Sequence, residues 1–521
     1  MARISRRKAI AAAGLAVVGL AGWKAAKLSA SPQNDKDCGP VTSVSEVGPD
    51  AASTLPWSSK GGTINDVSCL SRTPVFGVVK VATEKDIADA LAYARQKNLK
   101  VSMAGARHSM GGHAFATGGI VLDMTDFKSV TLSLDRPSIT VQSGARWHDI
   151  QNLLHPGFAV KAMQSSDVFT VGGSISVNAH GMDHHVGAIE RTIKWLRLML
   201  PDGSIVVLSR TENSDLYYHV VGGYGLFGVI LDAELDITPN TIYSSKRELI
   251  HLSDFPQVWK DHLEPDSSVG LFYGHLSTSP DSFLDELLIY TYHVTDVSNA
   301  GAPPLGDVSS VPMRRLIFNL AKEGSLLQRL KWFSEKELEH RFESCTLNDI
   351  VKQTGEACLV SRNEPMHDSV PYLFNALNYE TDILHEYFVP RQNLLPFVSA
   401  MRTLMQEQDA LLLNASIRVV HKEDIALNYA PEDAFSVVLY INQRVDDAGI
   451  EKMARLTSAL IDLADQHGGR FFLPYQRHYN AQQLKRAYPM IADIFQAKRR
   501  YDPTGLFSNS FYAAYASGIG A

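Results

Sequence analysis

The sequence predicts an α+β protein in which a glycine-rich mixed region precedes an antiparallel sheet covered by helices. The chain has 521 residues, of which 45% are hydrophobic and 20% are charged, so it can form two or three domains with a sizeable core. Near its start a strand, an amphipathic helix and a second strand follow one another, which is a β-α-β beginning. In its second half, strands alternate with helices in the way expected of an antiparallel sheet with helices on one side.

Residues 72–240 are expected to form the first domain. An amphipathic helix at 84–97, with Thr83 as its N-cap, lies between strands at 75–81 and 100–103. The further elements are strands at 120–123, 130–134, 138–143 and 229–237, helices at 147–154 and 213–221, and a hairpin turn at Pro201-Asp202-Gly203. Pro239-Asn240 marks the boundary with the second domain.

Residues 241–470 are expected to form the second domain, and residues 471–521 to return to the first. The elements of the second domain are strands at 287–294, 383–389, 411–420 and 435–442 and helices at 391–408 and 448–467. Residues 31–71 are rich in Ser, Pro, Gly and Asp and lack a sustained periodicity, so we predict a linker and surface arm there.

Residues 1–30 have the composition of a targeting segment. Arg6 and Arg7 precede a soft apolar run at 9–22, and the small residues at 28–30 suit cleavage. This pattern is typical of a twin-arginine signal, which directs a folded, cofactor-loaded protein to the export machinery. An ordinary secretory signal and an uncleaved anchor are the alternatives. We therefore expect a periplasmic or exported protein, and anchoring to the membrane through an uncleaved signal is the alternative.

Charge and cysteine content narrow the function further. The net charge of −7 gives no general attraction to nucleic acid, so no nucleic-acid partner is expected. Cys38, Cys69, Cys345 and Cys358 fall into two pairs that are close in sequence, and an oxidising compartment would allow both pairs to form disulfides, although spacing alone does not prove it. There is no Cys-x-x-Cys motif, which disfavours a zinc ribbon or a thioredoxin-like site.

Two glycine-rich loops carry the strongest motifs. The loop at 104–113 directly follows a strand, and loops of this kind present backbone N–H groups to phosphate oxygens. A second glycine-rich loop covers 170–181, and two such loops predict a diphosphate ligand. Residues 223–228 also match G-x-G-x-x-G, but they follow a helix and lead into a strand, which is the reverse of the dinucleotide-binding order.

On these motifs the chain resembles the FAD-linked oxidases of the vanillyl-alcohol-oxidase, or PCMH-type, fold. The resemblance covers about 72–515 and is carried by the segments 105–109, 170–174, 178–181, 222–228, 386–390 and 502–509. It implies a two-part FAD-binding domain, followed by a substrate domain that covers the flavin.

The resemblance also implies a set of residues that contact FAD. His108 corresponds to the histidine that is often bonded covalently to the flavin, and the hydroxyls of Thr170, Ser174 and Ser176 would hold the diphosphate. Ile230 would lie near the adenine. The full set of expected cofactor residues is Gly105, Ala106, Arg107, His108, Ser109, His113, Thr170, Gly172, Gly173, Ser174, Ser176, Asn178, His180, Ile230 and Asn509.

The substrate side is predicted from one strand and one later segment. Strand alternation places Asn414, Ser416 and Arg418 on one face. Polyol-oxidising relatives carry a Glu-x-Arg pair here, so Arg418 matches their arginine while Ser416 replaces their acid. Arg477 and His478 stand where relatives carry a basic active-site residue, and a solvated arginine and a structural histidine are the alternatives.

The general base is left open among four residues, which are His180, His421, Tyr475 and His478. His180, His184 and His185 are also alternative metal ligands, but no acidic helical motif accompanies them and no metal site is expected.

Together these features predict an exported FAD-dependent oxidoreductase that oxidises a CH–OH group of a sugar, polyol or lactone. Hydride would pass to flavin N5, and electrons would then pass to O2 or to a quinone or cytochrome. The alternative is a non-catalytic flavin- or sugar-binding envelope protein on the same fold, and the missing acid at Ser416 is its best support.

Overall fold

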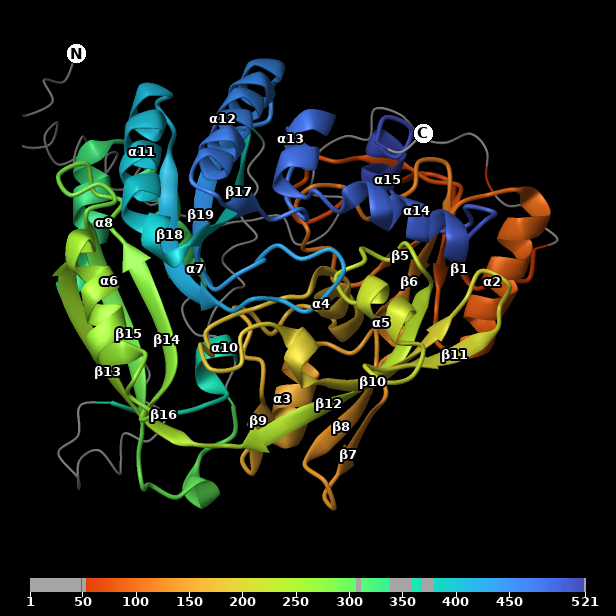
Figure 1. Cartoon of the computed structure of the whole chain (residues 1–521), viewed down its shortest axis with the longest axis horizontal. Coiled ribbons are helices and arrows are strands. Elements are labelled where there is room, and N and C mark those ends of the chain that lie inside the picture. Colours follow the sequence, from red (N-terminus) through yellow and green to blue (C-terminus); the bar gives the residue numbers. More distant parts are fainter. Residues whose placement is uncertain (1–47, 49–52, 306–310, 338–357, 368–378, 520–521) are drawn as a thin grey trace, which may run out of the picture.

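The computed structural model describes residues 48, 53–305, 311–337, 358–367 and 379–519. Figure 1 shows a large antiparallel sheet on one side of the molecule and two smaller sheets on the other. This arrangement confirms the α+β class. The predicted signal at 1–30 lies outside the described residues.

The first sheet is mixed and has the order β1-β4-β6-β5. Its strands are β1 (Trp57–Lys60), β4 (Gly77–Lys80), β6 (Ile120–Asp123) and β5 (Val101–Ala104), and both pairings of β6 are parallel. Helix α2 (Glu84–Lys97) packs its buried residues against this sheet. Thr83 and Asp86 form a capping box at its start, which confirms the predicted N-cap.

The prediction of a linker and surface arm is wrong for residues 53–71. Trp57 packs edge-on against Tyr93 with ring centroids 5.8 Å apart, and β2 (Thr63–Ile64) pairs with β3 (Thr73–Pro74). Asp66 is buried and accepts a hydrogen bond from the Gly112 backbone N–H at 2.7 Å. Hydrogen bonds of this kind leave no apolar periodicity in the sequence, which is why the segment resembled a linker.

The second sheet is antiparallel and has the order β11-β10-β12-β8-β7, with β9 also paired to β12. Its strands are β7 (Val130–Ser133), β8 (Ser138–Gln142), β9 (Phe158–Val160), β10 (Ile193–Met199), β11 (Ile205–Leu208) and β12 (Val229–Pro239). The helices of this region are α3 (Trp147–Leu154), α4 (Val171–Val177) and α5 (Ser214–Val220). Strands β10 and β11 form the predicted hairpin.

The third sheet is antiparallel and has the order β16-β13-β15-β14-β18-β19-β17-β20. Its strands are β13 (Ile242–His251), β14 (Val269–Leu276), β15 (Glu286–Val294), β16 (Leu359–Ser361), β17 (Glu380–Pro390), β18 (Leu412–Val420), β19 (Ala434–Arg444) and β20 (Arg470–Phe471). Its helices are α6 (Phe255–Val258), α7 (Val311–Ala321), α8 (Ser325–Glu337), α10 (Glu364–His367), α11 (Leu394–Glu407) and α12 (Asp447–Gln466).

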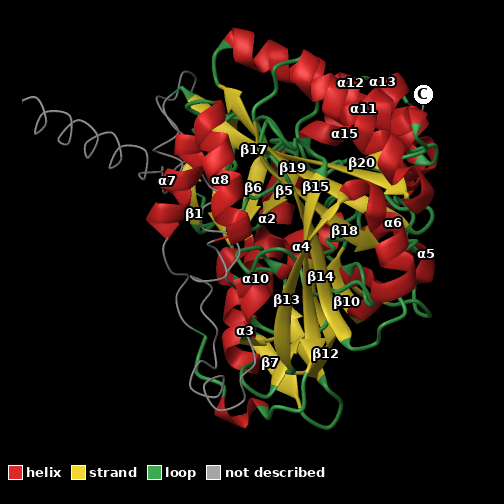
Figure 2. Ribbon diagram, turned by 90° about the vertical axis from the view of Figure 1, so that its left-hand side faces the viewer, coloured by secondary structure: helices red, strands yellow, loops and turns green. Residues whose placement is uncertain are grey.

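Helices lie on both faces of the third sheet rather than on one (Figure 2). Trp259, next to α6, packs against Phe272 on β14, whereas Trp332 of α8 packs against His275 on the same strand. Positions 272 and 275 face opposite sides of a strand. The sequence prediction missed α7 and α8, and with them the second covered face.

The C-terminal segment carries α13 (Ala481–Ala487), α14 (Ile491–Tyr501) and α15 (Ser510–Tyr515). Phe507 pairs in parallel with Val101 of β5, so this segment lies against the first sheet. Asp502 accepts hydrogen bonds from the backbone N–H groups of Leu506 and Phe507, which shapes the turn that brings it there.

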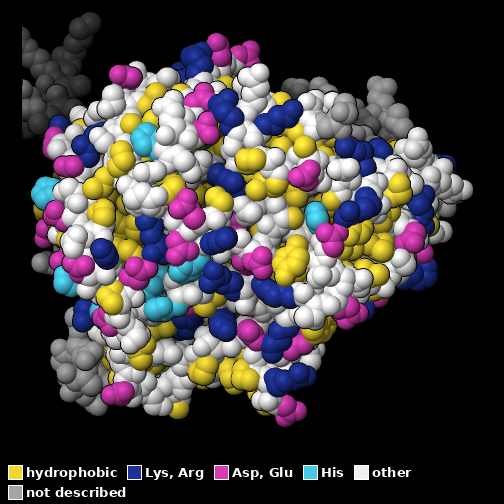
Figure 3. All heavy atoms as spheres, viewed as in Figure 1, with side chains coloured by type: hydrophobic (Ala, Val, Ile, Leu, Met, Phe, Trp, Pro, Cys, Tyr) yellow, Lys and Arg dark blue, Asp and Glu magenta, His cyan; other side chains and the backbone are white. Residues whose placement is uncertain are grey.

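Three further features concern the surface and the cysteines. Within the described ranges, no helix is long and apolar enough to cross a membrane. Acidic and basic side chains are interspersed over the face shown in Figure 3.

Cys69 and Cys358 are both disulfide-bonded. Their expected partners, Cys38 and Cys345, lie outside the described residues.

Candidate active site

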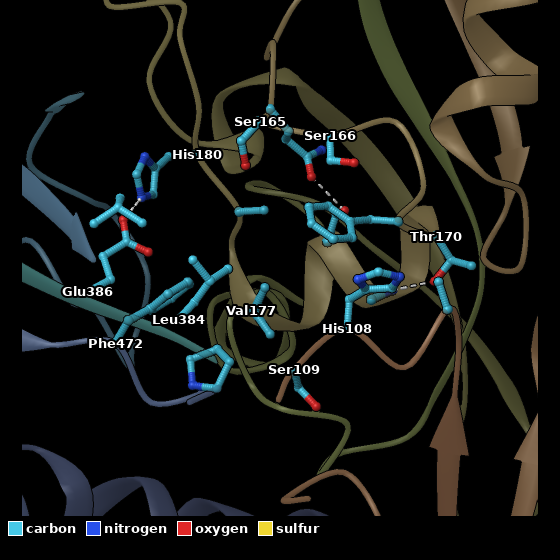
Figure 4. A pocket seen from close by; sticks show the side chains of 18 of the residues that line it. His108, Ser109, Ser165, Ser166, Thr170, Val177, His180, Leu384, Glu386 and Phe472 are labelled. Atoms are coloured by element: carbon cyan, nitrogen blue, oxygen red, sulfur yellow. Dashed lines mark hydrogen bonds and ion pairs between the residues drawn. The ribbon is translucent and has the colours of Figure 1, made fainter. Parts of the chain in front are cut away.

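A cavity of about 1000 Å³ lies between the glycine-rich loops of the first domain and the third sheet. One wall consists of the loops at 104–109 and 164–182, and the other includes residues of β14, β15, β17, β18 and β19. Figure 4 shows His108 and Thr170 at one end of this cavity and His180 and Glu386 at the other.

The loop after β5 has the backbone shape of an anion-binding concavity. Arg107 and Met110 adopt positive φ angles of 57° and 56°, which curl the chain. Within the part of the chain that the structure describes, the backbone N–H groups of Ala106, His108 and Ser109 find no acceptor. These groups are therefore available to phosphate oxygens.

Gly105 is required where the two glycine-rich loops meet. A Cβ atom at this position would lie 2.0 Å from Thr170 Oγ1, much closer than van der Waals contact allows. Thr170 in turn caps α4, because its Oγ1 accepts the N–H of Gly173. The glycine thus lets the first loop pack directly on the start of α4.

Buried polar atoms without partners lie on the same wall. The hydroxyl of Ser174 accepts from Trp147 Nε1 at 2.9 Å and donates to Gln164 Oε1 at 2.8 Å. This leaves Gln164 Nε2 buried with no hydrogen-bond partner among the described residues, and Ser143 Oγ is in the same state. Both residues line the cavity. Unpaired buried polar atoms are rare, so a polar ligand is expected to complete them.

His108 faces the cavity with a ring nitrogen that carries no proton at neutral pH. Its ring packs edge-on against Phe169, with centroids 5.4 Å apart. Burial, together with the positive charges of Arg146 and Arg107, lowers the pKa of His108 to about 4. A neutral imidazole keeps the lone pair that a covalent bond to a flavin would need.

The features of this wall fit FAD. The free N–H groups suit the diphosphate. The unpaired Gln164 and Ser143 atoms suit polar groups of the flavin ring or the ribose. Residues of both glycine-rich loops line the cavity. Among the remaining predicted cofactor residues, those at the wall are His113, Gly172, Gly173, Ser176, Ile230 and Asn509.

At the opposite end of the cavity, Glu386 of β17 binds His180. The distance from His180 Nε2 to Glu386 Oε1 is 2.6 Å, and the two side chains are only 3% and 4% exposed. Ser436 Oγ donates to the same carboxylate oxygen at 2.5 Å. The other imidazole nitrogen, His180 Nδ1, is buried and has no partner among the described residues. It is therefore the ring atom left to contact a ligand.

The carboxylate of Glu386 is held in its charged form. Burial alone would raise the pKa of Glu386. The charge and hydrogen bond of His180, the hydrogen bond of Ser436 and the positive charge of Arg418 outweigh it, so the pKa lies below its usual value. His180 Nε2 is the nitrogen that donates to the ionised Glu386, so Nδ1 is an acceptor whenever the ring is neutral.

Glu386 places a carboxylate on the same face of the third sheet as Ser416. Ser416 of β18 pairs with Val438 of β19, and Val438 pairs with Glu386 of β17. The three residues therefore form one row across the sheet, and all three line the cavity. An acid is therefore present on this face, but it lies on β17, two strands away from Ser416, the position at which polyol-oxidising relatives carry theirs.

Not every predicted residue faces the cavity. Arg418 and Tyr475 line it, whereas Asn178, His421, Arg477 and His478 do not. Asn178 is buried behind the wall, where its side chain bonds Glu423 and the N–H of Glu190.

The residues away from the cavity have partners elsewhere. His421 Nε2 lies 2.6 Å from the carbonyl oxygen of His184, and Arg477 donates to that of Ser510. His180, His184 and His185 do not form a group of metal ligands among the described residues. His184 instead packs edge-on against Trp259.

Sequence reasoning missed Glu386 and an aromatic wall. Glu386 begins a motif that was recognised, but its partner His180 lies 206 positions away and no local pattern links them. Tyr273 and Tyr290 stack at 4.5 Å with planes 9° apart, and Tyr292 and Tyr440 also line the cavity. Cross-strand pairing of β14 and β15 creates this wall, and it could have been found only once those strands were aligned.

The fold and the cavity define a protein that binds an extended, diphosphate-bearing cofactor beside a buried acid–imidazole pair. Sequence comparison identifies the cofactor, because residues 76–209 match the FAD binding domain family. The resemblance to PCMH-type FAD-linked oxidoreductases is thereby confirmed, and this part of the chain is an FAD-binding domain.

Three relatives illustrate the similarity. An uncharacterized oxidoreductase of the fasciation locus of Rhodococcoides fascians is 32% identical over 33% of this chain and 39% of its own length. An FAD-linked oxidoreductase of Aspergillus fumigatus is 29% identical over 32% of this chain and 36% of its own. Cytokinin dehydrogenase 2 of Arabidopsis thaliana is 29% identical over 36% of this chain and 38% of its own. The chain thus spans less than two fifths of the length of these relatives.

Proposed function

We propose that this protein is an exported FAD-dependent oxidoreductase that oxidises a CH–OH group of a sugar, polyol or lactone. The observation that carries the proposal is the buried His180–Glu386 pair at the end of the cavity opposite His108 and Thr170. Bound FAD would supply the hydride acceptor, and its electrons would pass on to O2 or to a quinone or cytochrome.

His180, in the loop after α4, and Glu386 of the third sheet would together handle the substrate proton. As the substrate carbon loses its hydride, His180 Nδ1 would take the hydroxyl proton and the product would be a carbonyl compound. The resulting imidazolium would be stabilised by the ionised Glu386, 2.6 Å from Nε2. Arg418 lines the same cavity and would bind a substrate oxygen.

The aromatic wall supports a ring-shaped substrate. The stacked pair Tyr273 and Tyr290 offers a flat apolar surface next to polar groups from Arg418 and Asn414. A sugar or lactone ring has an apolar face and a polar edge, and it matches such a surface.

His108 would attach the FAD covalently. It is neutral, it lies in the cofactor loop, and Phe169 holds its ring. Covalent attachment would keep the cofactor on a protein that works outside the cytoplasm, in line with the export signal expected at residues 1–30. Fractionation of cells that express the full chain, with and without Arg6→Lys and Arg7→Lys together, tests the export step.

Anaerobic titration tests the proposed reaction. The purified flavoprotein is mixed without oxygen with a panel of sugars, polyols, lactones, hydroxy acids and amines, and its visible flavin absorbance is recorded. Bleaching by a sugar, polyol or lactone is expected. Bleaching by an amine alone would show that the substrate is a C–N rather than a CH–OH donor. The absence of bleaching with every compound would favour a non-catalytic flavin-binding protein.

A further inference from the structure

Two imidazoles and one carboxylate converge beside the cofactor cavity at His148, Asp167 and His367. His148 Nδ1 lies 2.9 Å from Asp167 Oδ2, and His367 Nδ1 lies 2.8 Å from the same oxygen. The three atoms are all within 4.8 Å of one another. Among the described residues, this is the only such group of three.

The three side chains come from separate parts of the fold. His148 belongs to α3, Asp167 to the loop before α4, and His367 ends α10, which follows β16 of the third sheet. Helices α3 and α10 lie side by side in both ribbon views (Figures 1 and 2). The two imidazole rings stack with centroids 5.1 Å apart. The cluster therefore joins the first domain to the second.

The positions of the three atoms are fixed by further contacts. The backbone N–H of His148 donates to the carbonyl oxygen of Asp167 at 2.8 Å. The side-chain amide of Asn152 lies 3.1 Å from His148 Nε2 and orients that ring. The Asn152 nitrogen also donates to the His148 carbonyl oxygen, so Asn152 and Asp167 together fix the orientation of the His148 ring.

Asp167 is a buried carboxylate without a permanent positive partner. Its side chain is 6% exposed and that of His367 is 4% exposed. Within the described residues, the ion pairs of Asp167 are with the two imidazoles alone, and these carry charge only when protonated. A buried anion is stable when a cation neutralises it.

We propose that His148, Asp167 and His367 bind a divalent transition-metal ion of the zinc type. Zinc takes nitrogen and oxygen ligands at about 2.0–2.2 Å, which places neighbouring ligand atoms of a tetrahedral site about 3.3 Å apart. The observed separations of 2.8 and 2.9 Å need to widen by only a few tenths of an ångström. Two histidines and one carboxylate are a ligand set that zinc uses.

The fourth coordination position would face an open pocket. A cavity of about 740 Å³ borders all three residues and gives access to water and ions. Lys128 and Arg146 also line this cavity. Asp126 and Asp149 line it as well, so the cavity carries charges of both signs and a water molecule can take the fourth position.

The metal would act as a clamp on the cofactor wall. Asp167 is separated by one residue from Phe169, whose ring contacts His108, and the Trp147 backbone N–H bonds the Phe169 carbonyl oxygen. An ion that ties α10 to this loop would fix the loop against the second domain. The sequence prediction of no metal site considered only His180, His184 and His185, and this cluster could not be seen without the fold.

Zinc titration of the full flavoprotein tests the proposal. The protein is treated with EDTA, desalted and titrated with ZnCl2 by calorimetry, and bound zinc is then counted by elemental mass spectrometry. We expect one zinc ion per chain. Asp167→Asn and His367→Ala should each weaken binding about 100-fold, whereas His251→Ala, which removes an exposed histidine outside the cluster, should leave it unchanged.

A measurement on the unaltered protein guards against variants that do not fold. Zinc at a large excess over its dissociation constant should raise the midpoint of thermal unfolding by several degrees, and EDTA should reverse the rise. The proposal is overturned if zinc binds to only a small fraction of the chains, or if binding survives both Asp167→Asn and His367→Ala. The three residues would then be a hydrogen-bonded His–Asp–His group.

Discussion

Replacing Glu386 by glutamine should slow substrate oxidation strongly while leaving the fold intact. Glutamine has nearly the same shape as glutamate and can still accept the hydrogen bonds of His180 and Ser436, which are 2.6 and 2.5 Å long. What Glu386→Gln removes is the negative charge beside the imidazole. That charge matters only when His180 has taken the substrate proton.

The size of the effect follows from the separation of the two charges. With an imidazolium and a carboxylate whose charge centres lie about 4 Å apart, the attraction is about 4 kcal/mol at an effective dielectric constant near 20. Arg418 already offsets part of the Glu386 charge, so we discount this value by up to half. A loss of about 2–4 kcal/mol in the transition state corresponds to a rate decrease on the order of 30- to 1000-fold.

Anaerobic stopped-flow reduction of the flavin measures this step directly. Tyr475→Phe is the matched control, because the Tyr475 hydroxyl lies 3.5 Å from Glu386 and its removal should cost less than about tenfold. A Glu386→Gln rate within about threefold of the unaltered enzyme would refute the role of the pair. A larger loss in Tyr475→Phe than in Glu386→Gln would instead make Tyr475 the base.

Three further predictions concern the cofactor, acid stability and packing. His108→Ala should leave any bound flavin removable by acid precipitation, and flavin that stays in the pellet would refute the attachment at His108. Burial and the charge of His478 lower the pKa of His385 to about 3. A histidine in the unfolded chain has a pKa of about 6.5, so between these two pH values only the unfolded state binds the extra proton. The free energy of unfolding therefore falls as the pH falls from about 6.5 towards 3. His385→Gln should remove part of this fall, on the order of 1 kcal/mol per pH unit, as measured by urea unfolding at pH 5 and 7; identical pH dependences would contradict the assignment. Gly181→Ala should lower the midpoint of thermal unfolding markedly, because the added Cβ would lie 1.7 Å from a backbone oxygen. Gly157→Ala is the control, since a Cβ there has open space and the midpoint should hardly change. Equal midpoints for the two variants would show that the loop at Gly181 shifts without cost.

Local sequence patterns predicted those elements whose stability is local. The helix at 84–97 was predicted from its amphipathic pattern and the Thr83 cap, and the helix at 147–154 was predicted with the bounds that the structure shows. Helix α4 was read as a loop, because its Gly-Gly-Ser stretch has low helix propensity. It forms because Thr170 caps it and because Val171 and Ile175 are buried by the rest of the fold.

The candidate site could be predicted from the sequence only where its residues are close to one another along the chain. The glycine-rich loops were recognised from runs of adjacent residues, and His108 and Thr170, which were singled out there, both line the cavity. The His180–Glu386 pair depends on strand β17 meeting a loop 206 positions earlier, which no local pattern reports. His421 and His478 had suitable chemistry, but tertiary packing turns them away from the cavity.

The central claim is that this cavity holds FAD, attached through His108, and one measurement tests it most directly. The purified protein is precipitated with acid, the absorption spectra of pellet and supernatant are recorded, and intact mass is determined on the same sample. We predict flavin in the pellet and an added mass equal to that of FAD. Flavin in the supernatant would contradict the covalent bond, and the absence of flavin from both fractions would contradict the cofactor itself.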